Sequence, residues 1–162
     1  KNIKENVWIK NVELSINYKN NLIIKVVEFS PIGLFNFNNK LFYFDSTGNI
    51  IDEYSSHDGY KENLVIFSGD LSNKKAFEIF EIINMFDNNF VLNISNIDFI
   101  KKRRWNILLK NNIILKLSEE NPYESIENYT KIVKNLSEAQ INNILSIDLR
   151  NITKSIIKFK ND

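Results

Sequence analysis

One stretch of the chain gathers the residue types of nucleophilic catalysis. The single histidine, His57, follows Ser55 and Ser56 and precedes Asp58. A serine–histidine–aspartate array activates a hydroxyl group for attack on a carbonyl carbon, but its members come together across a fold, not along the sequence. We therefore favour an exposed loop histidine. A small hydrolase that uses His57 is kept as the alternative from the enzyme class.

Carboxylates in and around the same loop offer oxygen ligands for a cation. They are Asp45, Asp52, Glu53, Asp58 and Glu62. Calcium-binding loops place their ligands at fixed positions, and this spacing matches none of them. We favour a solvated acidic loop that holds no metal.

The strongest run of positive charge is Lys101-Lys102-Arg103-Arg104. It has three interpretations: a solvated strand end, a docking patch for an acidic partner, or a nucleic-acid contact. The 162-residue chain carries 21 Lys plus Arg against 20 Asp plus Glu, a net charge of +1. Because nucleic-acid binding relies on an excess of positive charge, we expect no nucleic-acid partner.

Composition excludes several kinds of site. The chain has no cysteine, which removes disulfides, thiolate zinc sites and cysteine nucleophiles. One histidine cannot make a multi-histidine metal site, and four glycines argue against a glycine-rich phosphate loop. The sequence therefore predicts neither a metal nor a cofactor.

Arginine is scarce, with Arg103, Arg104 and Arg150 as its three occurrences. The planar guanidinium group pairs bidentately with carboxylates, which lysine cannot do. If the strand over 105–109 lies near the strand over 145–150, the three arginines form one basic surface. Such a surface predicts an acidic partner segment.

Alternating apolar and polar residues predict the strands that position these groups. In the first half, strands are expected over 11–18, 22–29, 32–37, 41–44 and 50–51, with a short apolar segment over 64–67. Asparagine tolerates positive φ at small cost, so Asn20-Asn21 and Asn38-Asn39 are predicted hairpin turns. Residues 45–49 form another turn.

Helices and a second set of strands are expected after residue 70. Ser72 is predicted to cap a helix over 73–86, and 90–100 is expected to be extended. The clearest hairpin spans 105–117. Pro122 begins a second helix, Ser137 opens a short third helix through a capping box, and strands follow over 145–150 and 155–159. The predicted fold class is α+β, a mostly antiparallel sheet with two to three helices packed on one side.

Four segments, in this order, resemble landmarks of one bacterial family. They are 8–14 with 22–32, 44–50, 103–117 and 147–150. The second is similar to the pattern D-x-x-G-x-hydrophobic, the third to R-R-x-W-x-L-x-L-x-N-G-hydrophobic, and the fourth to I/V-D-L-R. Together they resemble the FtsQ (DivIB) family of cell-division proteins, across the join between its POTRA domain and its β domain.

The resemblance implies a domain division and a location. Residues 1–30 correspond to the C-terminal hairpin of a truncated POTRA domain, and 31–162 to the β domain. The chain begins with Lys1 and not with methionine, as expected of a fragment or a processed product. Family members are anchored in the inner membrane by one N-terminal helix, which is missing here. This part is then periplasmic and acts at the division septum.

The resemblance also implies a role. Family members are non-enzymatic scaffolds of the divisome that bind the small coiled-coil proteins FtsB and FtsL during septum formation. The runner-up interpretation is another extracytoplasmic POTRA-type module for protein assembly.

The last strand is the expected place for the partner. An open edge at 155–159 offers unpaired backbone groups to an incoming strand, and Lys154, Lys158 and Lys160 discourage self-pairing there. We hypothesise that FtsB adds a strand beside 152–159. The alternative is an ordinary interior strand with both sides paired. The predicted partner-binding residues are Arg103, Arg104, Arg150, Asn151, Ile152, Ser155, Ile157 and Phe159.

Overall fold

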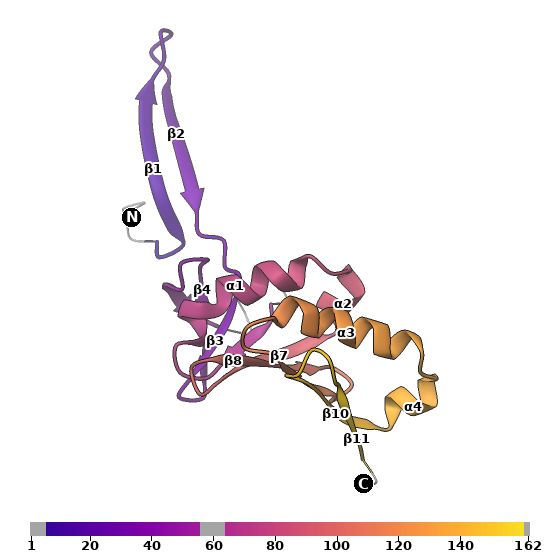
Figure 1. Ribbon diagram of the computed structural model, residues 1–162. Coiled ribbons are helices and arrows are strands. Elements are labelled where there is room, and N and C mark those ends of the chain that lie inside the picture. The colour runs from indigo at the N-terminus through magenta and orange to yellow at the C-terminus, as the bar shows by residue number, and fades with distance from the viewer. Residues whose placement is uncertain (1–5, 56–63, 161–162) are drawn as a thin grey trace.

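The computed structural model describes residues 6–55 and 64–160. Ser56, His57 and Asp58 lie outside the described residues, and so does Glu62. The described part consists of a projecting two-stranded hairpin and a body in which helices cover a nine-stranded sheet (Figure 1).

The hairpin pairs β1 (Ile9–Ile16) with β2 (Leu22–Glu28), and Asn20 takes the predicted positive φ of 58° in its turn. Its register places six aliphatic side chains on one face: Val12, Leu14, Ile16, Leu22, Ile24 and Val26. Leu14 is 66% exposed, so this face is open within the described part of the chain. The ring of Trp8 meets that of Tyr43 in the body, with 4.9 Å between centroids.

The large sheet has the strand order β11-β10-β9-β8-β7-β6-β3-β4-β5. Its strands are β3 (Gly33–Phe37), β4 (Lys40–Phe44), β5 (Ile50–Glu53), β6 (Ile66–Ser68), β7 (Ile94–Ile100), β8 (Arg104–Leu109), β9 (Ile114–Leu117), β10 (Ile144–Leu149) and β11 (Ile156–Phe159). The pairs β3/β6, β6/β7 and β9/β10 are parallel and the others are antiparallel. The α+β prediction is confirmed.

Four helices occur in the described residues: α1 (Ser72–Asn84), α2 (Asn88–Leu92), α3 (Pro122–Lys134) and α4 (Glu138–Asn142). α1 and α3 lie side by side on one face of the sheet (Figure 1), where the rings of Phe86 and Tyr123 are 5.1 Å apart. Pro122 begins α3 as predicted, and Ser137 with Gln140 forms the predicted capping box of α4.

Two predictions about the first helical region are wrong. Ser72 does not cap α1 but is its first, fully buried residue, because Leu71 before it turns the chain with φ of 64°. The segment expected to be extended from Phe90 begins as helix α2. Asp87 caps this helix by accepting a hydrogen bond from the Phe90 N–H at 2.9 Å.

The core follows from strand alternation, because cross-strand partners point to the same face of a sheet. One row of partners on the helix-covered face crosses seven strands and is apolar throughout: Phe35, Phe67, Ile97, Ile107, Leu115, Ile147 and Ile157. Helix residues such as Ile79 and Ile126 are buried on this face.

Six of the nine strands form two copies of one unit. A strand leads into a 13-residue helix, a five-residue helix and an antiparallel strand pair, first as β6-α1-α2-β7-β8 and then as β9-α3-α4-β10-β11. Corresponding helices begin 50 residues apart in the sequence, as Ser72 and Pro122 do. We call these the first and second βααββ units.

The correspondence extends to backbone detail. The strand pair of each unit carries a register shift at its start, after Ile94 in the first and after Ile144 in the second. The Lys110 N–H donates to the Asn93 carbonyl at 2.8 Å, and the Lys160 N–H donates to the Asn143 carbonyl at 2.9 Å. Each feature of the first unit can therefore be compared with its counterpart in the second.

The longest described helices, at 13 residues, extend for about 20 Å. A bilayer-spanning helix needs about 30 Å. Among the helices of residues 6–55 and 64–160, none has the length and apolar character needed to cross a membrane.

Candidate partner-binding surface

The last strand, β11, lies at one end of the nine-stranded sheet and pairs with β10 alone among the described strands. The Lys160 N–H points toward β10, where it donates to Asn143. Because backbone groups alternate in direction along a strand, the N–H and C=O of Ile157 point away from β10. The open edge expected from the sequence is therefore present within the described part of the chain.

Side chains of β11 alternate between the two faces of the sheet. Ile157 and Phe159 pack against the buried core on the helix-covered face. Ile156, which is 59% exposed, and Lys158 point to the other face. A substitution of Phe159 therefore affects packing as well as any partner contact.

Arg104 and Arg150 lie on either side of Ser118, where β8, β9 and β10 run side by side. The two arginines line one cavity of about 280 Å³ together with Leu117, Ser118, Glu119 and Glu120. The Nε atom of Arg104 is buried and has no hydrogen-bond partner among the described residues. Two of the three arginines thus lie at one cavity, whose lining also carries two carboxylates.

The Arg150 side chain is held by a carboxylate of its own strand. Its Nε donates to the two Asp148 carboxylate oxygens at 2.8 and 3.0 Å, and its Nη2 donates to Oδ2 at 2.5 Å. This hydrogen bonding lowers the pKa of Asp148 and raises that of Arg150. The side chain of Arg150 remains 48% exposed, so the pair orients the guanidinium group without burying it.

Arg103 does not join that surface. It faces the helix-covered side of the sheet, where its Nη1 lies 3.6 Å from Oε2 of Glu119. Alternation along β8 explains the separation, because Arg103 and Trp105 share one face while Arg104 points to the other. The expectation of one surface formed by all three arginines is corrected.

The loop between β10 and β11 holds Asn151, Ile152 and Ser155. The Asn151 carboxamide oxygen accepts hydrogen bonds from the N–H and hydroxyl of Thr153, at 3.0 and 2.8 Å. Asn128 of α3 donates its Nδ2 to the Ile152 carbonyl at 2.9 Å. The loop is thus fixed to the body beside the open edge.

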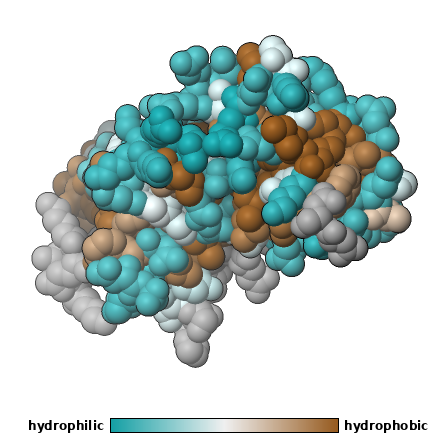
Figure 2. Space-filling model, turned by 60° about the horizontal axis from the view of Figure 1, so that its bottom comes forward, coloured by the Kyte–Doolittle hydropathy of each residue, from teal (hydrophilic) through white to brown (hydrophobic). Residues whose placement is uncertain are grey.

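The sheet face opposite the helices carries a row of mostly polar cross-strand neighbours. These are Ser68, Asp98, Asn106, Lys116, Asp148 and Ile156. Figure 2 brings the underside of the molecule forward and shows hydrophilic residues between hydrophobic patches there. Burial raises the pKa of Asp98, although Asn96 donates a hydrogen bond to its carboxylate at 2.5 Å. The row ends at Ile156 on β11, the edge strand of the sheet.

In the described part of the acidic segment, Asp45 stabilises the turn over residues 45–49. Burial alone would raise the pKa of Asp45, but hydrogen bonds to Oδ1 from the Thr47 hydroxyl at 2.6 Å and from the Asn49 N–H at 3.0 Å outweigh it and lower the pKa. The turn then brings the Gly48 carbonyl to Asn73 Nδ2 at 2.8 Å. Residues 6–55 and 64–160 contain no group of three or more acidic or histidine side chains placed to hold a metal ion.

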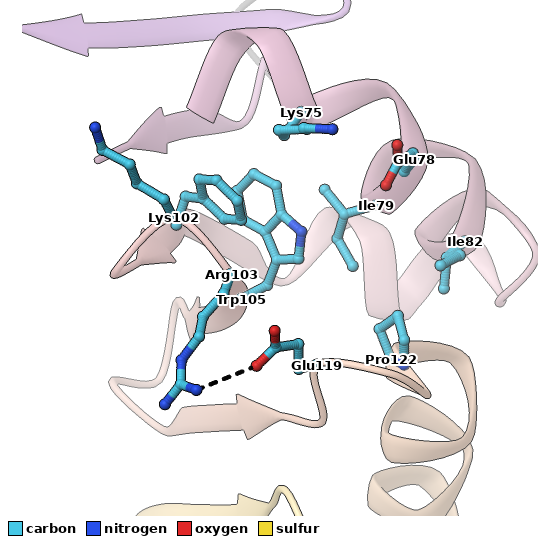
Figure 3. A pocket seen from close by; sticks show the side chains of 10 residues that line it. Lys75, Glu78, Ile79, Ile82, Lys102, Arg103, Trp105, Glu119 and Pro122 are labelled. Atoms are coloured by element: carbon cyan, nitrogen blue, oxygen red, sulfur yellow. Dashed lines mark ion pairs between the residues drawn. The ribbon is translucent and has the colours of Figure 1, made fainter. Parts of the chain in front are cut away.

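Sequence reasoning missed a groove on the helix-covered face. Two adjoining cavities of about 280 and 420 Å³ share Ile82 and Pro122 in their walls. One of them lies beside Trp105 and the β7–β8 turn (Figure 3). No pattern in the basic run Lys101–Arg104 indicated that α1 would lie beside this run. The repeated segments Asn93–Asp98 and Asn143–Asp148, both of the form N-I-x-x-I-D, were the available signal of the two units.

Comparisons with known proteins place the chain among cell-division proteins. The family model described as "Cell division protein FtsQ/DivIB, C-terminal" matches residues 34–150. The cell division proteins FtsQ of Rickettsia felis and Rickettsia prowazekii are each 28% identical over 158 residues, covering 97% of this chain and 57% of their own. The chain thus spans less than two thirds of these relatives.

A solved structure is also similar, the major extracytoplasmic domain of the trans isomer of the cell division protein DivIB from Geobacillus stearothermophilus. It has a TM-score of 0.45 and 11% identity, covering 68% of this chain and 99% of that one. The family model covers most of the nine-stranded body, from β3 through β10. The chain therefore belongs to the FtsQ/DivIB family of cell division proteins.

Proposed function

We propose that this chain is part of a non-enzymatic scaffold of the division machinery, which holds FtsB and FtsL outside the inner membrane during septum formation. Its own contribution is a strand-binding edge at β11, beside the surface formed by Arg104 and Arg150. Anchoring by a helix that precedes this segment, and a POTRA domain that ends with the β1–β2 hairpin, belong to the same proposal. Membership of the FtsQ/DivIB family supports the role in division.

The observation that carries the proposal is the equivalence of two edges. β8 of the first βααββ unit corresponds to β11 of the second. The outer edge of β8 is filled by β9, which pairs with it antiparallel. The outer edge of β11 has no such strand among the described residues, which supports addition of a partner strand at this edge.

The pairing of β9 with β8 suggests a register for the partner. Leu115 of β9 stands opposite Ile107, and Ile114 stands opposite Leu108. The corresponding positions of β11 are Ile157 and Lys158. A partner strand that runs antiparallel to β11 then puts an apolar side chain opposite Ile157 and an acidic side chain opposite Lys158.

Charge supports an acidic partner. Lys154, Lys158 and Lys160 are exposed along or beside β11. Arg150 is oriented by Asp148 but half exposed, and its remaining N–H groups can donate to a second carboxylate. Positive charge around an open edge raises the encounter rate with an acidic segment.

The test measures binding of the extracytoplasmic part of FtsB from the same bacterium by isothermal titration calorimetry. Ile157→Pro removes an N–H that points away from β10 and needs no internal bond, so the fold tolerates it better than it would inside the sheet. We expect at least about a tenfold loss of affinity, since strand addition depends on main-chain hydrogen bonds.

Glu53→Pro is the matched control. It lies on β5, the opposite edge of the same sheet, and its N–H donates to Asp52 Oδ1 at 2.8 Å. Wild-type affinity in this variant is the expected result. Equal loss in both variants, or unchanged affinity in Ile157→Pro, contradicts binding at β11.

A further inference from the structure

A second surface lies on the helix-covered face, away from the β11 edge. Ile79 and Ile82 of α1, with Phe99 and Trp105 of the β7–β8 hairpin, form the apolar floor of the first cavity of the groove (Figure 3). The rings of Phe99 and Trp105 are 4.3 Å apart, and Phe67 meets Trp105 edge-on at 6.2 Å. The indole is therefore fixed in place by aromatic neighbours.

The two ends of the groove differ in charge. The end at the β7–β8 turn carries Lys75, Lys102 and Arg103 against Glu78 and Glu119. The end at the start of α3 carries three carboxylates, Glu120, Glu124 and Glu127, around Pro122 and Tyr123. The lining thus has a net positive charge at one end and a strongly negative charge at the other.

The cations at the positive end are available for exchange. Lys102 pairs with Asp70 at 2.6 Å, with both side chains more than half exposed, and no described residue forms an ion pair with Lys75. Exposed ion pairs contribute little to stability, so a partner carboxylate can replace Asp70 or Glu119 at little cost.

The second βααββ unit provides an internal comparison. The residue that corresponds to Glu78 is Asn128, and the one that corresponds to Lys102 is Ile152. Asn128 donates to the Ile152 carbonyl at 2.9 Å and so ties the helix to the loop. The carboxylate of Glu78 cannot donate the hydrogen bond that the Asn128 carboxamide donates. In the first unit the groove lies open at the corresponding place.

The turn that presents Lys102 is itself strained. Lys101 and Lys102 have φ of 52° and 57°, and the Arg103 N–H donates to the Ile100 carbonyl at 3.2 Å. The same pair of left-handed residues in the β3–β4 turn is Asn38-Asn39, with φ of 50° and 62°. Left-handed backbone is unfavourable for most residues, whereas asparagine and glycine adopt it readily. Lysines in these positions destabilise the fold, which indicates that their charge has a function.

We propose that this groove binds a short segment of a partner protein in which a large apolar side chain stands between a carboxylate and a cationic side chain. The apolar side chain packs over Ile82 and Pro122 against Trp105. The carboxylate meets Lys75 and Lys102, and the cation meets Glu120 and Glu124. The occupant is identified by charge complementarity along the groove, because a segment of a single charge sign meets repulsion at one end.

Three short synthetic peptides with a central phenylalanine test the proposal by calorimetry with the 162-residue chain. The first has paired aspartates at one end and paired lysines at the other, the second has aspartates at both ends, and the third has lysines at both ends. We expect the first to bind about tenfold more tightly than either of the others. Trp105 emission, measured in a Trp8→Phe background, should change on binding.

Charge reversal at each end gives opposite outcomes. Lys75→Glu with Lys102→Glu should shift the preference to the lysine peptide. Glu120→Lys with Glu124→Lys should shift it to the aspartate peptide. Lys110→Glu, an exposed lysine at the other end of β8, is the matched control and should leave the preference unchanged. All these side chains are exposed, and thermal melts confirm that each variant folds.

Several results would overturn the proposal. They are no binding by any peptide, equal binding by all three, an unchanged preference in the reversed variants, or the same change in Lys110→Glu. Ile157→Pro separates this surface from the β11 edge. Peptide binding that is lost in that variant assigns the peptides to β11 and removes the groove as a site.

Discussion

Asp98 and Asp148 are corresponding residues of the two βααββ units, and their carboxyl groups have opposite pKa shifts. Burial raises the pKa of Asp98, whereas the hydrogen bond from Arg150 is the main cause that lowers the pKa of Asp148. The residue that corresponds to Arg150 is Ile100, which offers no charge. The presence of one guanidinium group thus accounts for the difference.

The two aspartates predict opposite pH dependences of stability. A carboxyl group with a raised pKa in the folded state costs stability once it ionises, so the contribution of Asp98 falls as the pH rises above the ordinary value of 3.8. Asp98→Asn should therefore become more stable than wild type as the pH rises from that value to neutrality. Denaturant unfolding at several pH values measures the difference.

Asp148→Asn supplies the comparison of opposite sign. The lowered pKa of Asp148 gives stability that is present above 3.8 and is lost as the pH falls through the folded-state value. This variant should be less stable than wild type at neutral pH, with the difference shrinking in acid. The same sign in both variants would contradict the assigned causes.

At the residue scale, the sequence indicated which side chains to consider, but it did not predict on which face of the sheet each of them lies. The scarcity of arginine singled out Arg103, Arg104 and Arg150, and two of these share a cavity. Arg103 lies on the other face because the strand begins at Arg104 and side chains then alternate. A one-residue uncertainty in a strand boundary is enough to exchange faces, and sequence patterns fix boundaries no better than that.

Among the elements, the β7–β8 turn allows a direct test of its strain. Lys101→Asn with Lys102→Gly places in the left-handed positions the pair most favoured in such turns. We expect the free energy of unfolding to rise by about 1–3 kcal/mol, since two left-handed non-glycine residues are relieved. Urea denaturation measures the gain.

Asn38→Lys with Asn39→Lys is the reciprocal change in the β3–β4 turn, which has the same backbone geometry. This variant should lose a similar amount of stability. If the free energy of unfolding does not rise in Lys101→Asn with Lys102→Gly, the two lysines are not strained. The turn then no longer indicates a function.

Prediction of the elements from sequence succeeded where local chemistry decides the structure. Asn38-Asn39, Pro122 and the Ser137 capping box each act through their own backbone neighbours and lie where expected. It failed at Leu71, whose left-handed φ comes from the tight chain path after β6, and at α2, a single helical turn stabilised by packing of Phe90. Those features depend on tertiary contacts that no local pattern contains.

The whole molecule places most of its stability in the body and little in the β1–β2 hairpin. Leu14 is 66% exposed, whereas Leu115 in the centre of the large sheet is fully buried. Leu14→Lys should therefore shift the melting temperature of this chain by less than about 2 °C. Leu115→Ala should lower the free energy of unfolding by about 2–5 kcal/mol.

Leu14→Lys also tests the proposal that the hairpin is the end of a POTRA domain. In a longer protein whose preceding segment covers the aliphatic face of the hairpin, Leu14→Lys should destabilise the domain that contains it by several degrees. Indifference to the substitution in the longer protein would contradict the proposal that the hairpin completes a domain.

The order of strands in the whole sheet could not be predicted from the sequence. Turn signals predicted neighbours in sequence, such as β8 with β9, but β3/β6 and β9/β10 are parallel pairs joined across other elements. The open edge at β11 depends on that order. Its expectation came from the strand being last in the chain, a weaker reason than the duplication that now supports it.

Amide hydrogen exchange on addition of the extracytoplasmic part of FtsB from the same bacterium tests the central claim most directly. If a partner strand pairs with the edge of the sheet, exchange in β11 (Ile156–Phe159) should slow strongly, while exchange in β5 (Ile50–Glu53), the opposite edge, stays unchanged. Binding that leaves the β11 amides as they were, or that protects β5 instead, would contradict strand addition at β11.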